Sequence, residues 1–402
     1  MMLTTGSLLN RLERDRHTDE KFTFAMPTAA GPCRFGVYNV MHKVILEQTG
    51  WDARVNVFSP DDGDYFRETS SEFSIKLWCG FVAYDLLEAM VYDVRPVERR
   101  KGAANAFYQQ YKGEILACME RHSKGTAMNA TLEVLGGMWG LRDLLSRAAR
   151  DMAAIKNRVR DVPSVAVVGE IYVRLDPFAN DFIIEKLEER GIRARFAPFV
   201  EWLEYTQYLA ERRVLDQRMR HDDNPLSIGV TGVVQRASME VLYQICAKPL
   251  EWGERTTIPT TLEAAVPYLS PDLTGEACLT LGGPIHEFHQ KLVQGVVVVG
   301  PHECMPCRIA EAQYGKVAED MNLPYLVLAL NGDPLDTEAL DRFAYDIHEA
   351  HRRGLGRDLG TVLHRMGGTD ARPSAAKDDP TLVPLRLSAD DGVKANGRRA
   401  LD

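Results

Sequence analysis

Short apolar runs alternate with longer stretches of helical periodicity along most of this sequence, and this alternation limits the folds that it can adopt. Residues 165–168 and 296–299 are runs of mainly β-branched side chains, of the kind that forms buried strands. Further strands are predicted at residues 22–26, 53–58, 192–197 and 325–328. Because helical patterns follow these runs, the sequence predicts an α/β fold with parallel sheets and right-handed crossovers.

The same patterns divide the 402-residue chain into five predicted parts. They are an N-terminal extension (1–21), a partial α/β lobe (22–101), a helical connector (102–161), an α/β lobe with a helical insertion (162–365) and a disordered tail (366–402). The tail is expected to be disordered because few apolar residues follow Gly367. Two lobes with parallel sheets, joined by a helical connector, are therefore expected.

Composition narrows the classes of function. A formal charge of −9 argues against a nucleic-acid surface, which would carry a basic stripe. No apolar run is long enough to span a bilayer, and residues 1–10 do not resemble a signal peptide, so a cytoplasmic location is expected. Seven cysteines in such a chain argue against a disulfide framework. Small molecules and other proteins remain as partners.

A Pro-Cys-Arg tripeptide occurs twice, as Pro32-Cys33-Arg34 and Pro306-Cys307-Arg308. Each tripeptide lies between a strand-like run and a helical pattern, where parallel sheets bind their ligands. The helix N-terminus and the adjacent arginine should make both thiols easy to ionise. The second tripeptide completes a C-x-x-C motif that begins at Cys304. If the two units are related by a rough two-fold, the three thiolates would face one another across a cleft and share one cluster.

Several interpretations of these cysteines remain open. Cys33, Cys304 and Cys307 would suit an iron–sulfur cluster, because its soft iron prefers thiolate ligands. A zinc site would need a fourth ligand such as His302, and a redox dithiol would use the C-x-x-C motif alone. Alternatively, all three are core thiols at the starts of helices. Core positions are expected for the other cysteines, which are Cys79, Cys118, Cys246 and Cys278.

Polar residues follow the strand predicted at 165–168, at the same edge of the sheet. Charged groups packed beside a sheet edge usually need a partner. The candidates for contacts to a substrate or to the cluster ligands are Arg34, Glu170, Tyr172, Arg174, Asn180 and Arg308. Asp176 and Pro177 have a local explanation, because they are typical of the N-cap and first position of a helix, here predicted to run through Arg190.

Several separated segments match, in order, the motifs of one known family. Residues 27–36 resemble its P-T-x-x-G-P-C-R-F-G, residues 169–181 its G-E-I-Y-V-R-x-x-P-F-x-N-D, and residues 304–306 its C-M-P. Residues 78–87 and 275–277 add to the agreement, which covers about residues 22–350. The chain thus resembles the 2-hydroxyacyl-CoA dehydratase and benzoyl-CoA reductase subunits. It is most similar to the C-terminal region of the related large activase-type proteins, the CoA-substrate-specific enzyme activases.

The resemblance implies Rossmann-like lobes that hold a [4Fe–4S] cluster through cysteines and pass single electrons to a thioester substrate. It also implies an ATP-hydrolysing partner that drives electrons to low potential. The chain departs from the family at Ala30, where relatives often carry a cysteine, a ligand that Cys307 would replace. The ATPase modules and the further cysteine-bearing lobe of the large activase-type proteins are also missing from the sequence.

The sequence contains neither a G-x-x-x-x-G-K-[ST] loop nor a G-x-G-x-x-G after a strand. Its energy and electrons would therefore come from a separate ATPase chain. We expect an oxygen-sensitive iron–sulfur subunit of a low-potential electron-transfer system, acting as a dehydratase or reductase-like component on an acyl-CoA-like molecule. A paralogous cluster-bearing subunit is a further expected partner. The alternative is a non-catalytic iron–sulfur or zinc-binding scaffold or electron relay, normally closed by four protein ligands, whereas three cysteines leave one iron open.

Overall fold

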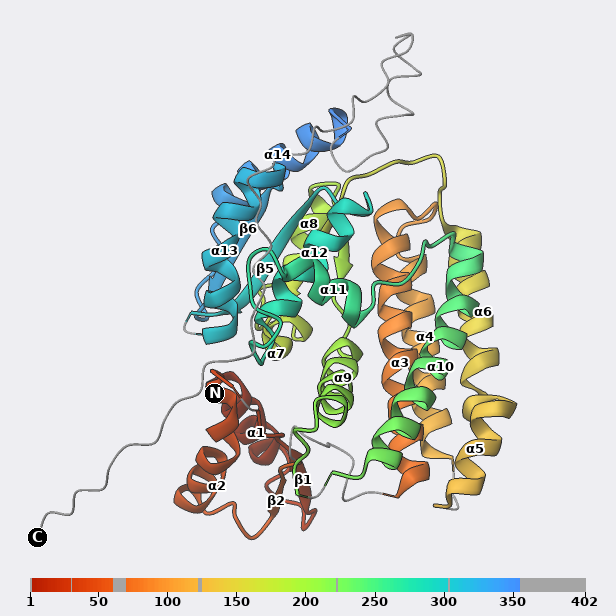
Figure 1. Cartoon of the computed structure of the whole chain (residues 1–402), viewed down its shortest axis with the longest axis vertical. Coiled ribbons are helices and arrows are strands. Elements are labelled where there is room, and N and C mark those ends of the chain that lie inside the picture. Colours follow the sequence, from red (N-terminus) through yellow and green to blue (C-terminus); the bar gives the residue numbers. More distant parts are fainter. Residues whose placement is uncertain are drawn as a thin grey trace, which may run out of the picture. The chain divides into compact units, whose positions relative to one another are not determined.

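The computed structural model of this chain has a mixed α/β fold (Figure 1). The structure describes residues 2–29, 31–60, 70–121, 125–221, 223–302 and 304–354. Two parallel sheets, of two and four strands, are flanked by helices, which confirms the predicted α/β class. None of the helices in the described ranges is long and apolar enough to cross a membrane. The predicted disordered tail, residues 366–402, lies outside the described residues.

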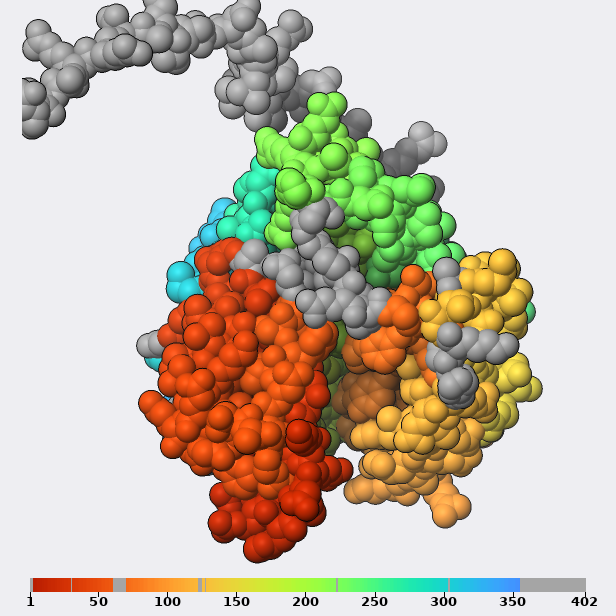
Figure 2. Space-filling model, turned by 90° about the horizontal axis from the view of Figure 1, so that it is seen from below, coloured from red at the N-terminus to blue at the C-terminus, as the bar shows by residue number. Residues whose placement is uncertain are grey.

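The N-terminal part is built around the two-stranded sheet. Its elements are α1 (Met2–Arg14), β1 (Phe22–Ala25), η1 (Arg34–Val37), α2 (Tyr38–Thr49) and β2 (Val55–Phe58). β1 pairs with β2 in parallel, with Phe22 opposite Val55. Leu12 of α1 is fully buried in the same apolar cluster as Leu46 of α2 and Val55. The segment predicted as an extension therefore contributes a helix to this core, and residues 2–60 form one continuous block in Figure 2.

A bundle of long helices forms the second part. It consists of α3 (Ser71–Val94), α4 (Ala103–Glu120), α5 (Ala127–Gly136), α6 (Leu141–Ile155) and α10 (Pro225–Leu250), with η2 (Arg95–Val97) and η3 (Met138–Gly140) as short connections. The helix α3 packs against α4, α6 and α10, because apolar residues occupy most of its circumference. The Nε1 of its Trp78 donates to Ser238 Oγ of α10 at 3.0 Å. Cys79, Cys118 and Cys246 are buried in this bundle, as predicted.

The four-stranded sheet has the strand order β4-β3-β5-β6, and all of its pairs are parallel. Its strands are β3 (Ser164–Gly169), β4 (Arg193–Phe196), β5 (Gly295–Pro301) and β6 (Tyr325–Leu330). Its helices are α7 (Ile171–Leu175), α8 (Ile183–Glu189), α9 (Val200–Leu215), α11 (Ile258–Ala265), α12 (Ala277–His289), α13 (Met305–Met321) and α14 (Thr337–Arg352). Alternate valines of β3 and β5 pack against α8 and α14 on one face and against α12 and α13 on the other. The sheet is therefore covered on both sides, as buried parallel strands require.

The prediction that Asp176 and Pro177 begin a helix is wrong. Asp176 instead ends the short helix α7, and α8 begins at Ile183. The Asp176 carboxylate accepts the Phe178 N–H at 2.9 Å and so stabilises a turn. The Asn180 amide donates to the Arg174 carbonyl at 2.9 Å and accepts the Ile183 N–H at 3.2 Å. These side chains offer the backbone local partners, which favours a turn over a continuous helix.

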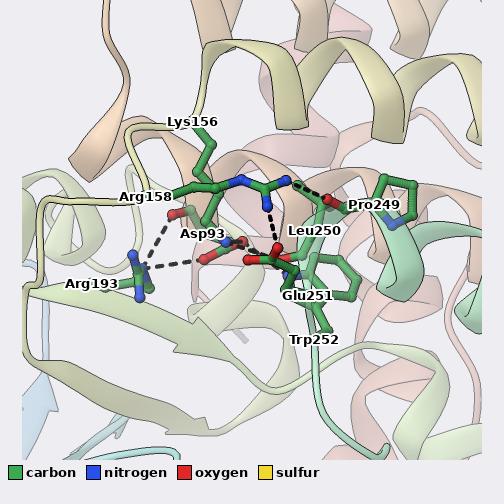
Figure 3. A network of polar contacts seen from close by, with 8 residues as sticks. All are labelled: Asp93, Lys156, Arg158, Arg193, Pro249, Leu250, Glu251 and Trp252. Carbon is green, nitrogen blue, oxygen red and sulfur yellow. Dashed lines mark hydrogen bonds and ion pairs between the residues drawn. The ribbon is translucent and has the colours of Figure 1, made fainter.

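A polar network connects the ends of α3 and α10 to the strand β4 (Figure 3). Asp93 Oδ2 accepts from Lys156 Nζ at 2.6 Å and from Trp252 Nε1 at 2.9 Å. Arg193 Nε lies 3.3 Å from Asp93 Oδ1 and donates to the Asp93 carbonyl at 3.1 Å. The Asp93 and Lys156 side chains are each 14% exposed. One carboxylate thus satisfies two cations and an indole at the junction of the bundle and the sheet.

Replacing Asp93 should destabilise this junction. Asp93→Ala leaves Lys156 and Arg193 without their carboxylate, and removing one partner of a largely buried pair costs about 3 kcal/mol. The free energy of unfolding should therefore fall by that order in urea denaturation followed by circular dichroism. The matched control is Glu338→Ala, whose side chain is 86% exposed beside Arg342 and should change stability by less than about 0.5 kcal/mol. Equal effects of both substitutions would contradict the role given to Asp93.

Candidate functional site

The strands β3 and β5 approach each other closely at their carboxyl ends. Gly169 pairs with Val299 and has a φ of +120°. A Cβ atom on Gly169 would lie 1.9 Å from the Val299 carbonyl oxygen, so this approach requires glycine. The next residue, Glu170, donates its N–H to that carbonyl at 2.9 Å. The loops that leave β3 and β5 therefore start side by side, as expected for neighbouring parallel strands.

The C-x-x-C motif lies at the N-terminus of α13. Cys304 is the N-cap residue and Cys307 belongs to the first turn. The Cys307 thiol donates a hydrogen bond to the Cys304 sulfur. Gly300 makes room for the Cys307 sulfur, because a Cβ atom on it would lie only 2.8 Å from Cys307 Sγ. Cys307 is buried, whereas Cys304 keeps part of its surface exposed.

The loop that carries Cys33 reaches the same region from the N-terminal part of the chain. Gly31, with a φ of +76°, packs so closely on Thr274 that a Cβ atom would lie 2.5 Å from Thr274 Oγ1. The neighbouring Gly275 lies against Pro306 of α13, with 3.9 Å between its ideal Cβ position and Pro306 Cγ. Residues 274–275 thus lie between the two Pro-Cys-Arg loops. Cys33 is close enough to Cys304 for their charges to interact, and it too is half-buried.

The three thiols differ in how readily they ionise. Burial and, to a smaller extent, the nearby Glu276 carboxyl raise the pKa of Cys33 to about 11. The hydrogen bond to Cys304 holds the proton of Cys307 and, together with burial, raises the pKa of Cys307. The same hydrogen bond lowers the pKa of Cys304. The prediction that both Pro-Cys-Arg thiols ionise easily is therefore wrong for the metal-free chain, because burial and nearby carboxyls outweigh the helix N-terminus and the arginines.

Two carboxyls accompany the thiols. Burial raises the pKa of Glu170, although its carboxylate accepts the Val173 N–H at 2.8 Å and lies near Arg174. Burial raises the pKa of Glu276 well above its usual value, and Glu170 adds to that shift. Glu170 and Arg174 were each expected to need a charged partner, and each is in part the partner of the other. Glu276 was not among the predicted candidates, because an acid just before a helix is a common way to complement the helix dipole.

Arg174 is the cation that these acids share. Its side chain is buried, with 5% exposure, and its guanidinium lies 5.6 Å from the centre of the Phe196 ring. The acids whose pKa it lowers are Asp85, Glu170, Glu201 and Glu276. Among the described groups, the Arg174 Nε has no hydrogen-bond partner. One guanidinium thus offsets several carboxyls that come from different elements.

The remaining predicted candidates divide into two kinds. Tyr172 Oη forms a hydrogen bond with Ser7 Oγ of α1 at 2.9 Å, and the Asn180 amide is engaged with backbone groups between α7 and α8. These contacts give both residues a structural explanation. Arg34 instead lies near the thiols, where its charge lowers the pKa of Cys304.

Arg308 forms hydrogen bonds with the loop that carries the C-x-x-C motif. Its Nε and Nη2 donate to the His302 carbonyl at 2.9 and 2.7 Å, and its Nη1 pairs with Glu311.

Within the described ranges, no group of three or more His, Cys, Asp or Glu side chains converges as the ligands of a single metal ion. The zinc interpretation, with His302 as the fourth ligand, therefore gains no support. A cluster is larger than one ion, so its cysteines need not converge on one point.

The thiol pKa shifts predict which cysteine is most reactive. In the metal-free chain at pH 8, iodoacetamide should alkylate Cys304 on the order of tenfold faster than Cys33, because only the thiolate attacks. The rate at Cys33 should keep rising up to its pKa of about 11, whereas the rate at Cys304 should level off at a lower pH, because its pKa is lowered. Mass spectrometry of peptides after timed quenching measures both rates.

The Cys307→Ala variant and the buried Cys118 serve as controls for this experiment. Losing the thiol donor should slow alkylation of Cys304, and Cys118 should stay unlabelled in the folded chain. Equal rates at Cys33 and Cys304 would contradict the described environments.

No protein family, curated protein or solved structure matches this chain in the three comparisons made. The resemblance to the dehydratase and reductase subunits therefore stays a prediction. What the site can do has to be inferred from its own residues.

Proposed function

We propose that this chain binds an iron–sulfur cluster through Cys33, Cys304 and Cys307 and serves as the iron–sulfur subunit of a low-potential electron-transfer system. The observation that carries this proposal is the meeting of two Pro-Cys-Arg loops, from distant parts of the sequence, around residues 274–275. Of the seven cysteines, Cys33 and Cys304 lie in the loops and Cys307 lies in the first turn of α13, whereas the other four are buried in other helices.

The residues present fit such a cluster. Thiolates are the ligands that soft iron prefers, and the missing side chain of Gly300 makes room for the Cys307 sulfur, which any Cβ atom there would crowd. The N-terminus of α13 and the Arg34 charge both favour negative sulfur. The raised pKa values of Cys33 and Cys307 do not oppose binding, because a coordinated thiol gives up its proton to the metal's charge.

Three cysteines favour a catalytic component over a relay or scaffold, which four protein ligands normally close. When bound, a [4Fe–4S] cluster would supply single electrons to an acyl-CoA-like thioester, as the resemblance implies. Beside it, burial raises the pKa of the Glu276 carboxyl well above its usual value. The missing phosphate loop supports a separate ATPase chain as the electron donor, with a paralogous cluster-bearing subunit as a second partner.

Single cysteine substitutions test the ligand set. After anaerobic purification, Cys33→Ala, Cys304→Ala and Cys307→Ala should each abolish the electron paramagnetic resonance signal and lower the iron and sulfide content. Cys118→Ala should keep both, because Cys118 is buried in the helical bundle. If all four variants keep the signal, the ligand assignment is wrong. A change of the signal on adding an acyl-CoA would favour the catalytic role, and an unchanged signal would favour the relay.

The space beside Cys307 allows a test that removes no ligand. Gly300→Ala places a methyl group 2.8 Å from the Cys307 sulfur, so iron content after anaerobic reconstitution should fall by at least about half. Gly315→Ala on α13 is the control, because its nearest neighbouring atom would be 4.0 Å away. Circular dichroism should show both variants folded. Full iron loading of the folded Gly300→Ala variant would show that this space is not needed.

A further inference from the structure

A cavity of about 450 Å³, partly open to solvent, lies between the helical bundle and the four-stranded sheet. This volume lies within the range of sites that hold small organic molecules, roughly 300–1,000 Å³. Val82 and Leu86 of α3 and Met239 of α10 form part of its apolar wall. Tyr243 and Trp252 also line it, with 5.9 Å between their ring centroids. The three cysteines of the candidate cluster site are not among its lining residues.

Most of the acids that line this cavity near α9 have partners. Arg195 Nη2 donates to Glu287 at 3.2 Å, and Arg255 Nη1 donates to Glu204 at 2.7 Å. Asp85 accepts the Val200 N–H at 2.8 Å. These contacts leave both arginines already paired with carboxylates, so the cavity offers little to an anion.

Glu201 of α9 differs from these acids. Its carboxyl makes no hydrogen bond or ion pair with any residue that the structure describes. The side chain is half-buried, and it lines both this cavity and a smaller recess beside Arg174 and Glu276. A carboxyl in such a place needs either a proton or a cation.

The charges around Glu201 come from four elements. Arg174 of α7 attracts its negative charge, whereas Glu287 of α12, Glu204 of α9 and Asp85 of α3 repel it. Burial and, to a smaller extent, these carboxyls raise the pKa of Glu201 to about 7, although Arg174 lowers it. Since Arg174 also offsets Asp85, Glu170 and Glu276, this region has too little positive charge for its acids.

We propose that this cavity binds a small organic amine, whose ammonium group pairs with Glu201 and whose hydrocarbon part lies against Val82, Leu86 and Met239. The largely apolar wall favours an organic cation over a bare metal ion, for which the described residues offer no converging ligand group. The rings of Tyr243 and Trp252 suit a cationic ligand as well, because aromatic faces attract positive charge. This site is separate from the proposed cluster and does not depend on it.

Calorimetric titration of the full chain with n-hexylamine tests the proposal, with n-hexanol as the uncharged probe of the same length. At pH 8 hexylamine should bind with a stoichiometry of one, and Glu201→Gln should weaken its binding at least about tenfold. Binding of hexanol should be the same in the wild type and the variant. Glu338→Gln, at an exposed position of α14, is the control and should leave both titrations unchanged.

The pH dependence gives a second readout. The amine stays protonated below pH 9, whereas Glu201 takes up a proton as the pH falls through about 7. Hexylamine affinity of the wild type should therefore drop about tenfold between pH 8 and pH 6, and that of Glu201→Gln should stay flat. No hexylamine binding at millimolar concentration, or equal affinity in wild type and a folded Glu201→Gln variant, would overturn the proposal.

Discussion

Parallel pairing of β3 with β5 is the constraint on which the candidate site depends. Because both strands run in the same direction, their carboxyl ends and the loops that follow lie at one edge of the sheet. The contact at Gly169 brings Glu170 directly onto the Val299 carbonyl, so the acid and the C-x-x-C loop begin from the same place. An antiparallel pairing would send these loops to opposite edges.

Several buried carboxyls surround one buried arginine at this edge of the sheet. Arg174 lies among carboxyls from α3, α7, α9 and the residue before α12, each of which has lost much of its contact with water. Removing charged groups from water costs several kcal/mol each, so such a cluster is weak evidence for stability. A small recess lined by Arg174, Glu201 and Glu276 adjoins both the cavity and the region of the thiols. The two proposed sites are thus electrostatic neighbours although they share no ligand.

The elements of the fold could be predicted where one local signal dominates. The valine runs at β3 and β5 are buried on both faces, and the gathering of the Pro-Cys-Arg loops follows from their places after strands. The prediction of a helix starting at Asp176 was wrong because the Asp176 and Asn180 side chains form hydrogen bonds with nearby backbone groups and hold a turn. These residue types are as compatible with a turn as with the start of a helix. The segment 2–14 was missed as part of a core because its role depends on distant Leu46 and Val55.

Ionisation at the site was beyond local reasoning for the same reason. Cys33 has favourable neighbours in sequence, but its pKa is set mainly by burial, with a smaller contribution from Glu276, which approaches from elsewhere in the chain. Glu201 likewise looks like an ordinary acid in the first turn of a helix. Its isolation becomes visible only when the facing α3 and α12 are in place.

The contact between Gly31 and Thr274 has a consequence for folding. It joins the N-terminal part of the chain to the loop before α12, so the three sulfurs can meet only after a very long loop has closed. A ligand bound by all three sulfurs would act as a cross-link between these distant segments. It would stabilise the native state against global unfolding, because the unfolded chain could not bind it with all three sulfurs.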